Sequence, residues 1–219
     1  MRYLFLALAG LLTAGLAAQT ADSATVSRFQ VGVTGGYAEH EIDFTPSADV
    51  ERLGGNQFGV AVRYFDHPWI GVQAELNYQE AGWREDLGED FTTLYERRTR
   101  YVEFVALTQT SFGRGVFQPL LQVGPYLAVP LGEEEDIPDG FVPPDTPLPT
   151  YIGRETDFRL NYGLRAGAGF NLEIGGLTIQ AEGFYLLGFN DIIRTGETTA
   201  AISRRTGVEG RAAIFYTLF

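Results

Sequence analysis

The chain offers few side chains that could do covalent chemistry. It contains two histidines and no cysteine, so a disulfide framework, a thiolate metal site and thiol redox chemistry are excluded. His40 lies near Ser47 and several acids, and a histidine can activate a serine hydroxyl as a nucleophile. Such residues often share a loop by chance, however, and His67 precedes Pro68 in a tight turn. We therefore predict no catalytic residue.

Two acidic clusters could bind a cation through their carboxylate oxygens. The first comprises Glu80, Glu85, Asp86, Glu89 and Asp90, and the second Glu133, Glu134, Glu135, Asp136 and Asp139. Neither has the spacing of an EF-hand loop, so we interpret both as solvated acidic surface in long loops. Gly32, Gly35 and Gly36 fall inside a strand pattern, which is the wrong context for a phosphate-binding loop. We predict neither a metal nor a cofactor.

Composition narrows the class of protein further. A length of 219 residues is typical of a single domain. All sixteen basic residues are arginine, against twenty-eight acids, and the formal net charge is -12. Because binding to a phosphate backbone requires a basic surface, this charge argues against a nucleic-acid partner.

The first residues have the order of a secretory signal. An arginine at position 2 is followed by an apolar stretch and then by small residues, so we predict a signal peptide over residues 1–18, removed near Ala17 or Ala18. A retained helical anchor is the alternative, which the small residues at the end of the segment disfavour. Residues 19–219 would then form the mature domain. The uncharged run 115–132 carries three prolines, so it cannot cross a bilayer as a helix.

The mature chain alternates apolar and polar residues with a period of two. In Asp157–Leu172 the even positions are apolar and the odd positions are charged residues, asparagine or glycine, a pattern that a strand produces and a helix does not. Similar alternation predicts eight strands, near residues 28–39, 56–66, 69–80, 98–111, 116–130, 157–173, 177–189 and 204–218.

The connections between these strands alternate in length. Three are tight, at residues 66–68, 113–115 and 175–176, and four are long, near residues 40–55, 81–97, 131–156 and 190–203. In an up-and-down barrel, alternate connections lie at opposite ends. We therefore predict an all-β, eight-stranded antiparallel up-and-down barrel with the long loops at one rim and both termini at the other.

Alternation alone would also fit a soluble barrel with apolar residues inside. Strands of this length suffice to cross a bilayer. Trp69 and Tyr78 lie at opposite ends of one predicted strand. They would lie ~23 Å apart along the membrane normal, as in an aromatic belt. Turning Arg165 toward lipid would cost about 2 to 4 kcal/mol. These features predict a transmembrane β-barrel with its charged face inside.

An eight-stranded barrel has an interior that its own side chains fill. Because confined charges must be paired, we predict a plugged, nearly charge-balanced polar lumen with a structural role. Its members would be Arg28, Arg63, Glu75, Glu103, Arg159, Arg165, Glu182, Glu209 and Arg211. A narrow ion path or a catalytic pair among these residues is the alternative.

Three segments, residues 74–82, 120–132 and 162–192, resemble the small outer-membrane β-barrel domain family that includes the PorT-like proteins of Bacteroidetes-type bacteria. More loosely, the chain is similar to OmpA- and OmpX-type barrels. The resemblance implies the outer membrane of a Gram-negative cell envelope and offers no catalytic residues. Phe219 matches the terminal aromatic that the barrel-assembly machinery recognises, although the better apolar series ends at Leu218.

These observations predict a monomeric outer-membrane barrel in contact with outer-membrane lipid, with a structural or interaction role. Its loops would meet an unidentified surface ligand or envelope protein. Two alternatives remain open at this point. One is a lipid-modifying barrel enzyme that uses His40 and Ser47, and the other is a soluble periplasmic ligand-binding barrel.

Overall fold

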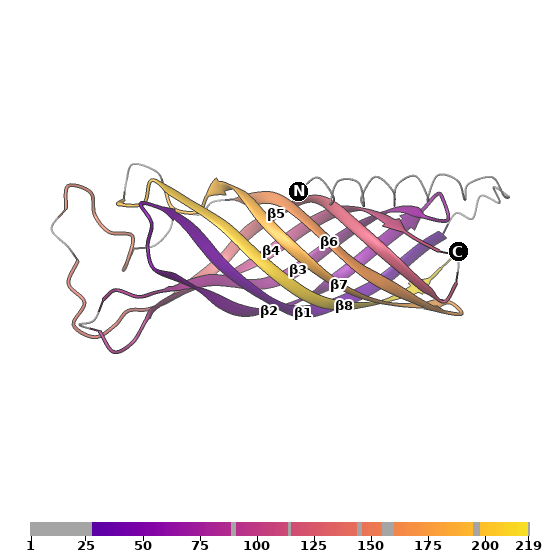
Figure 1. Ribbon diagram of the computed structural model, residues 1–219, viewed down its shortest axis with the longest axis horizontal. Helices are drawn as coiled ribbons and strands as arrows, with labels where there is room; N and C mark the ends of the chain where they lie inside the picture. Colours follow the sequence, from indigo (N-terminus) through magenta and orange to yellow (C-terminus); the bar gives the residue numbers. More distant parts are fainter. Residues whose placement is uncertain are drawn as a thin grey trace, which may run out of the picture.

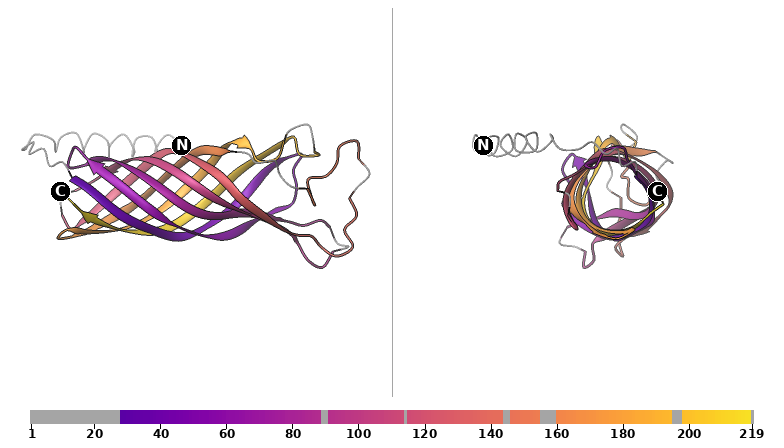
Figure 2. Two further views of the ribbon diagram at one scale, coloured as in Figure 1. Left: turned by 180° about the vertical axis from the view of Figure 1, so that it is seen from behind. Right: turned by 90° about the vertical axis from the view of Figure 1, so that its right-hand side faces the viewer.

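The predicted antiparallel barrel of eight strands is confirmed. The computed structural model describes residues 28–218 except 89–90, 114, 144–145, 155–159 and 195–197. Each strand pairs with the next, and β8 closes the ring on β1, as the end-on view in Figure 2 shows. The strands are β1 (Arg28–Thr45), β2 (Val50–Phe65), β3 (Ile70–Glu85), β4 (Tyr95–Ser111), β5 (Phe117–Asp136), β6 (Asn161–Ile174), β7 (Leu177–Asp191) and β8 (Ile202–Thr217).

The connections separate by length between the two ends of the barrel (Figure 1). Residues 66–69, 112–116 and 175–176 join strands at the short-turn end. The start of β1 lies at the same end, because the Leu218 amide donates to the Phe29 carbonyl at 2.9 Å. The predicted signal, residues 1–18, lies outside the described residues. Within the described part of the chain no helix is long and apolar enough to cross a membrane, which carries no information about spans made of strands.

Seven strands extend further than predicted at the end opposite the short turns, whereas β6 begins at Asn161 rather than near residue 157. The predicted loop 40–55 reduces to residues 46–49, and the predicted loop 81–97 reduces to residues 86–94. The other two long connections run over residues 137–160 and 192–201. Glu80, Glu85 and Glu133 therefore lie in strands rather than in loops. The apolar-out alternation that defined the predicted strands stops near residue 38, although the hydrogen-bonded ladder continues.

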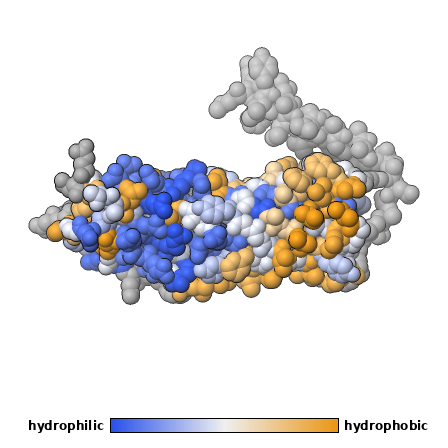
Figure 3. Space-filling view, turned by 90° about the horizontal axis from the view of Figure 1, so that it is seen from below, coloured by the Kyte–Doolittle hydropathy of each residue, from blue (hydrophilic) through white to orange (hydrophobic). Residues whose placement is uncertain are grey.

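The outer surface divides into two zones along the barrel (Figure 3). From the short turns to about Tyr37 and Tyr78, outward side chains are mostly apolar, and Val33 is 58% exposed. We call this zone the apolar band. Beyond it, outward positions of β1 are Glu39, Glu41 and Asp43. This outer section extends seven residues of β3 past Tyr78, or ~18 Å at a tilt of ~40°.

The interior changes in the opposite sense. Inside the apolar band many inward side chains are amides or charges, whereas inside the outer section they form an apolar cluster. Its buried members are Ile42, Phe44, Trp83, Tyr95, Tyr151, Ile152, Ile193 and Ala200. A barrel surrounded by lipid places its polar side chains inside, and a barrel surrounded by water places its apolar side chains inside. Both arrangements occur in this chain, in successive sections along the barrel axis.

A β-bulge on β5 sets which acids face inward in the outer section. Tyr101 pairs with Pro130 and Arg100 with Gly132, so Leu131 is the extra residue. An extra residue shifts the alternation of all that follow by one position. Glu133 and Glu135 therefore turn toward Arg97 inside the barrel, with oxygens 3.3 and 3.1 Å from its guanidinium nitrogens.

Glycine at position 163 is required by crowding inside the wall. A Cβ there would lie 2.0 Å from the Leu187 carbonyl oxygen and 2.7 Å from the Tyr126 ring. We expect Gly163→Val to lower the free energy of unfolding by about 1 to 3 kcal/mol, the usual cost of overpacking. Urea unfolding in detergent micelles measures it. Gly115→Val is the control, because nothing lies within 4 Å of its Cβ position; equal stability of the two variants would mean that the wall has room.

Candidate functional site in the barrel lumen

The buried charges of the described residues balance. They comprise five arginines and five glutamates: Arg63, Arg97, Arg165, Arg205, Arg211, Glu75, Glu85, Glu103, Glu182 and Glu209. Alternation of inward and outward positions on β2, β3, β4, β6, β7 and β8 points these side chains at one another across the ring. Charges removed from water must be paired or hydrogen-bonded to be tolerated. Eight of the ten belong to ion pairs, whereas Arg63 is held by amide side chains and Glu85 by the Tyr151 hydroxyl.

Glu103 is the centre of the first ion-pair cluster. One of its oxygens accepts from Arg165 at 2.6 Å, and the other accepts from Arg205. Arg165 also reaches Glu209 at 2.9 Å. The side chains of all four residues are 0% exposed. His40 joins this cluster through Gln79, whose side-chain nitrogen lies 2.7 Å from its Nε2.

Arg211 organises a second cluster closer to the short turns. It donates two hydrogen bonds of 2.6 Å to the two oxygens of Glu75, a bidentate geometry, which is the strongest form of such a pair. Its Nε donates to Glu182 at 2.5 Å. The Phe184 ring lies 4.5 Å from the guanidinium of Arg211 and 5.7 Å from that of Arg165, so cation–π contacts join the two clusters.

Amides fill the lumen next to the short turns. Arg63 donates to Gln30 at 2.5 Å and to Gln180 at 2.8 Å, and its guanidinium lies 3.9 Å from the centre of the Phe215 ring. Gln122 donates to Gln109 at 2.9 Å. Side chains of the chain itself thus occupy the lumen across the whole apolar band.

A segment of the long connection 137–160 closes the opposite mouth. We call residues 149–154 the strap, in which Thr150, Tyr151 and Ile152 are buried. Tyr151 stacks on Phe44, with ring centroids 5.1 Å apart and planes at 6°, and donates to Glu85 at 2.5 Å. Burial raises the pKa of the Tyr151 hydroxyl, so the phenol keeps its proton and acts as the donor.

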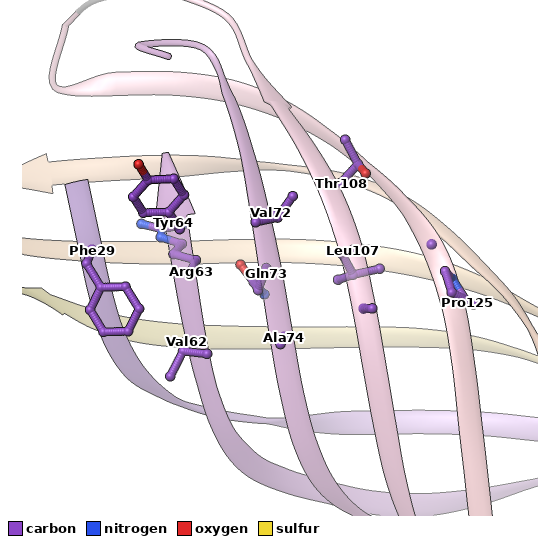
Figure 4. A pocket seen from close by; sticks show the side chains of 12 residues that line it. Phe29, Val62, Arg63, Tyr64, Val72, Gln73, Ala74, Leu107, Thr108 and Pro125 are labelled. Carbon is purple, nitrogen blue, oxygen red and sulfur yellow. The ribbon is translucent and has the colours of Figure 1, made fainter. Parts of the chain in front are cut away.

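A groove of about 340 Å³ lies on the wall rather than in the lumen. Figure 4 shows the side chains of β1 to β5 that line it. Val62, Tyr64 and Val72 belong to its outward-facing, exposed residues. Most of the lining is apolar and suits hydrocarbon chains, and the polar residues Arg63 and Gln73 of the lining are buried.

Seven of the nine predicted lumenal residues lie buried in the lumen: Arg63, Glu75, Glu103, Arg165, Glu182, Glu209 and Arg211. Arg28 lies at the short-turn rim, where it is partly exposed and pairs with Glu173 at 2.7 Å. Arg159 and Phe219 lie outside the described residues. Trp69 lies in the turn before β3, and Tyr78 faces outward against Phe58 at 5.0 Å between ring centroids. Their role as an aromatic belt stays a prediction.

Two lumenal arginines were missed by the sequence reasoning, Arg97 and Arg205. Each shares its parity with a residue that was assigned inward, Glu103 on β4 and Glu209 on β8. Extending each alternation by a few residues finds both arginines. The predicted strands began at residues 98 and 204, so Arg97 fell just outside the first, and Arg205 was passed over at the start of the second.

The candidate His40 and Ser47 pair is wrong as a site. His40 faces the lumen from within β1 and is fully buried, whereas Ser47 is exposed in the turn at 46–49. The strand continues to Thr45, which separates the two side chains. Of the two acidic clusters, the strand residues Glu80, Glu85 and Glu133–Asp136 alternate between the two faces of the wall. Among the described residues no group of three or more histidine, aspartate or glutamate side chains could hold a metal ion.

Comparison with known proteins gives the family. OprG from Pseudomonas aeruginosa matches with a TM-score of 0.50 at 11% identity, over 86% of this chain and 95% of that one. Neisserial surface protein A matches with a TM-score of 0.46 at 13% identity, over 86% and 96%. The outer membrane enzyme PagL matches with a TM-score of 0.36 at 12% identity, over 85% and 97%. These likenesses concern the fold alone.

A search of curated protein sequences finds no match to the chain. The model of the family described as outer membrane protein beta-barrel domain matches residues 17–194. The narrower likeness to PorT-like proteins stays a prediction. The match spans most of the chain and seven of the eight strands, so the chain belongs to the outer membrane protein beta-barrel domain family.

Proposed function

We propose that this protein is a monomeric, signal-exported barrel of the bacterial outer membrane that does not act as a wide pore. Its role is structural or interactive, through the outer section that projects beyond the membrane. The ion-pair network centred on Glu103 supports this proposal most strongly, because the paired side chains are 0% exposed. The interior of an eight-stranded barrel is just wide enough for such side chains.

Closure is supported at three levels of the barrel. Amides and Arg63 occupy the short-turn end, the two ion-pair clusters occupy the middle, and the strap fills the outer mouth. Moving ions through this path would require separating buried pairs that cost several kcal/mol each to desolvate. The lumen therefore serves to hold the wall in one shape.

Conductance in planar bilayers tests the closed lumen. We expect no steady channels from the purified, folded protein at any protein-to-lipid ratio, with an open porin measured in the same membranes as the positive control. Steady, sizeable channels that appear only with folded protein would contradict the proposal.

The outer section supports the interactive role. Its outward charges include the pairs Arg84–Glu96 and Arg100–Glu134 at 2.8 and 3.1 Å, and exposed pairs of this kind contribute little to stability. Such a surface stays wet and suits contact with an unidentified surface ligand or envelope protein. The barrel-assembly machinery is a further partner, during biogenesis. The lipid-modifying alternative has no support in this geometry, because His40 is buried in the lumen whereas Ser47 is exposed in the turn after β1.

A further inference from the structure

The Tyr151 side chain of the strap occupies a site that we call the aromatic box. It is formed by Phe44, Trp83, Tyr95 and Glu85. Phe44 stacks on the Tyr151 ring, and Trp83 meets it edge-on at 6.3 Å and 61°. Tyr95 meets Trp83 at 6.3 Å. Glu85 lies at the far end and accepts from the Tyr151 hydroxyl. Phe44, Trp83, Glu85 and Tyr95 all belong to strands β1, β3 and β4, so the box is part of the rigid wall, and its occupant belongs to a connection.

The box has the elements of a small-molecule site. Ligand sites combine apolar and aromatic walls with a few polar groups that fix orientation. Here stacking and edge contacts position a flat ring, and one buried carboxylate, 9% exposed, selects a hydrogen-bond donor. Leaving that carboxylate without a donor would be costly. This geometry favours a ring that carries a hydroxyl group over one that lacks it.

The occupant is attached in a way that permits exchange. Buried residues 150–152 are flanked by exposed residues 146–148 and 153–154. Apart from the contacts of Tyr151 itself, the strap is held by the packing of Ile152 in the apolar cluster and by Arg97, which donates to the carbonyls of Tyr151 and Arg154. A further bond runs from the Thr199 amide to the Pro149 carbonyl at 3.1 Å. None of these strap contacts belongs to the ladders of β1, β3 and β4, so displacing the strap would leave those ladders intact.

We propose that this box is a binding site for a small phenol, and that Tyr151 is its built-in competitor. The ligand enters from the outer face of the membrane, displaces the Tyr151 ring and donates its hydroxyl hydrogen to Glu85. This step rests on the proposed function in one respect, since a closed lumen below leaves the outer mouth as the route of entry.

Removing the competitor tests the proposal with p-cresol, the free form of the tyrosine side chain, as the probe. The chain has two tryptophans, so a Trp69→Phe background leaves Trp83 as a reporter inside the box. In this background we expect Tyr151→Gly to bind p-cresol at least ten-fold more tightly than the parent, by Trp83 emission and by calorimetry. Tyr151→Phe keeps a ring in the box but loses the hydrogen bond to Glu85, so it should bind p-cresol more tightly than the parent and less tightly than Tyr151→Gly.

Two further measurements distinguish a specific binding site from nonspecific hydrophobic binding. Toluene has the same ring without the hydroxyl, and we expect Tyr151→Gly to prefer p-cresol over toluene. Adding Glu85→Leu should abolish that preference. The proposal is overturned if Tyr151→Gly, shown to be folded by its heat-modifiable gel mobility, binds p-cresol no better than the parent, or binds toluene equally well. Bilayer conductance of the same variant reports on lumen closure separately, so the two proposals fail independently.

Discussion

Glu103→Gln is expected to lower the free energy of unfolding by about 3 to 5 kcal/mol, the cost of removing one partner from a buried ion pair. The substitution preserves shape and removes one negative charge. It leaves Arg205 without its paired acid, and Arg165 keeps Glu209 as its close acidic partner. Both guanidinium groups stay fully buried, so solvent cannot replace the lost interaction.

Urea unfolding in detergent micelles, followed by tryptophan fluorescence, measures this loss. Glu134→Gln is the matched control, because Glu134 also pairs with an arginine, at 3.1 Å, but its side chain is 67% exposed. Exposed pairs contribute about 0 to 1 kcal/mol. If the two variants lost equal stability, the network around Glu103 would be solvated and the closed lumen would be refuted.

Val33→Arg is expected to cost about 2 to 4 kcal/mol, the penalty for an arginine that faces lipid at the membrane midplane. Val33 faces outward, is 58% exposed and lies midway between Phe29 and Tyr37 on β1. Its partners on the two neighbouring strands are Val60 and Ile214, which are also exposed and apolar. Neither of these neighbours is an acid that could pair with the new charge.

The same substitution higher on the strand provides the control. Thr45 also faces outward, at the last position of β1 in the outer section. In lipid vesicles Thr45→Arg should change the free energy of unfolding by less than about 1 kcal/mol, since the penalty disappears toward water. A penalty at Thr45 as large as that at Val33 would mean that the membrane covers the outer section as well.

The number and order of the strands and the inward face of each were predictable from the sequence because a single rule, the period of two, applies wherever one face meets lipid. It assigned Glu75, Arg165 and Arg211 to the lumen correctly. The same rule failed beyond residue 38 of β1, where the solvent changes from hydrocarbon to water. Ile42 and Phe44 then face inward and Glu41 faces outward. A criterion that recognises strands by outward apolar residues therefore predicts a loop in this segment.

Other features depend on contacts that no local pattern encodes. The inward turn of Glu133 and Glu135 follows from one extra residue, Leu131, opposite Arg100 and Tyr101. Tyr151 belongs to a proline-rich connection that the sequence presents as extended surface. Its burial follows from Phe44 and Trp83, which lie over sixty positions away in the chain and meet it through closure of the barrel.

The account depends on the outward face of the apolar band contacting lipid tails, and nitroxide labels test this directly because the chain has no native cysteine. One label is placed by Val72→Cys in the band and another by Glu134→Cys in the outer section, each in lipid vesicles. We predict that dissolved oxygen relaxes the label at position 72 more than a water-soluble nickel chelate does, and that the order reverses at position 134. A label at position 72 that responds mainly to the nickel chelate would contradict the account.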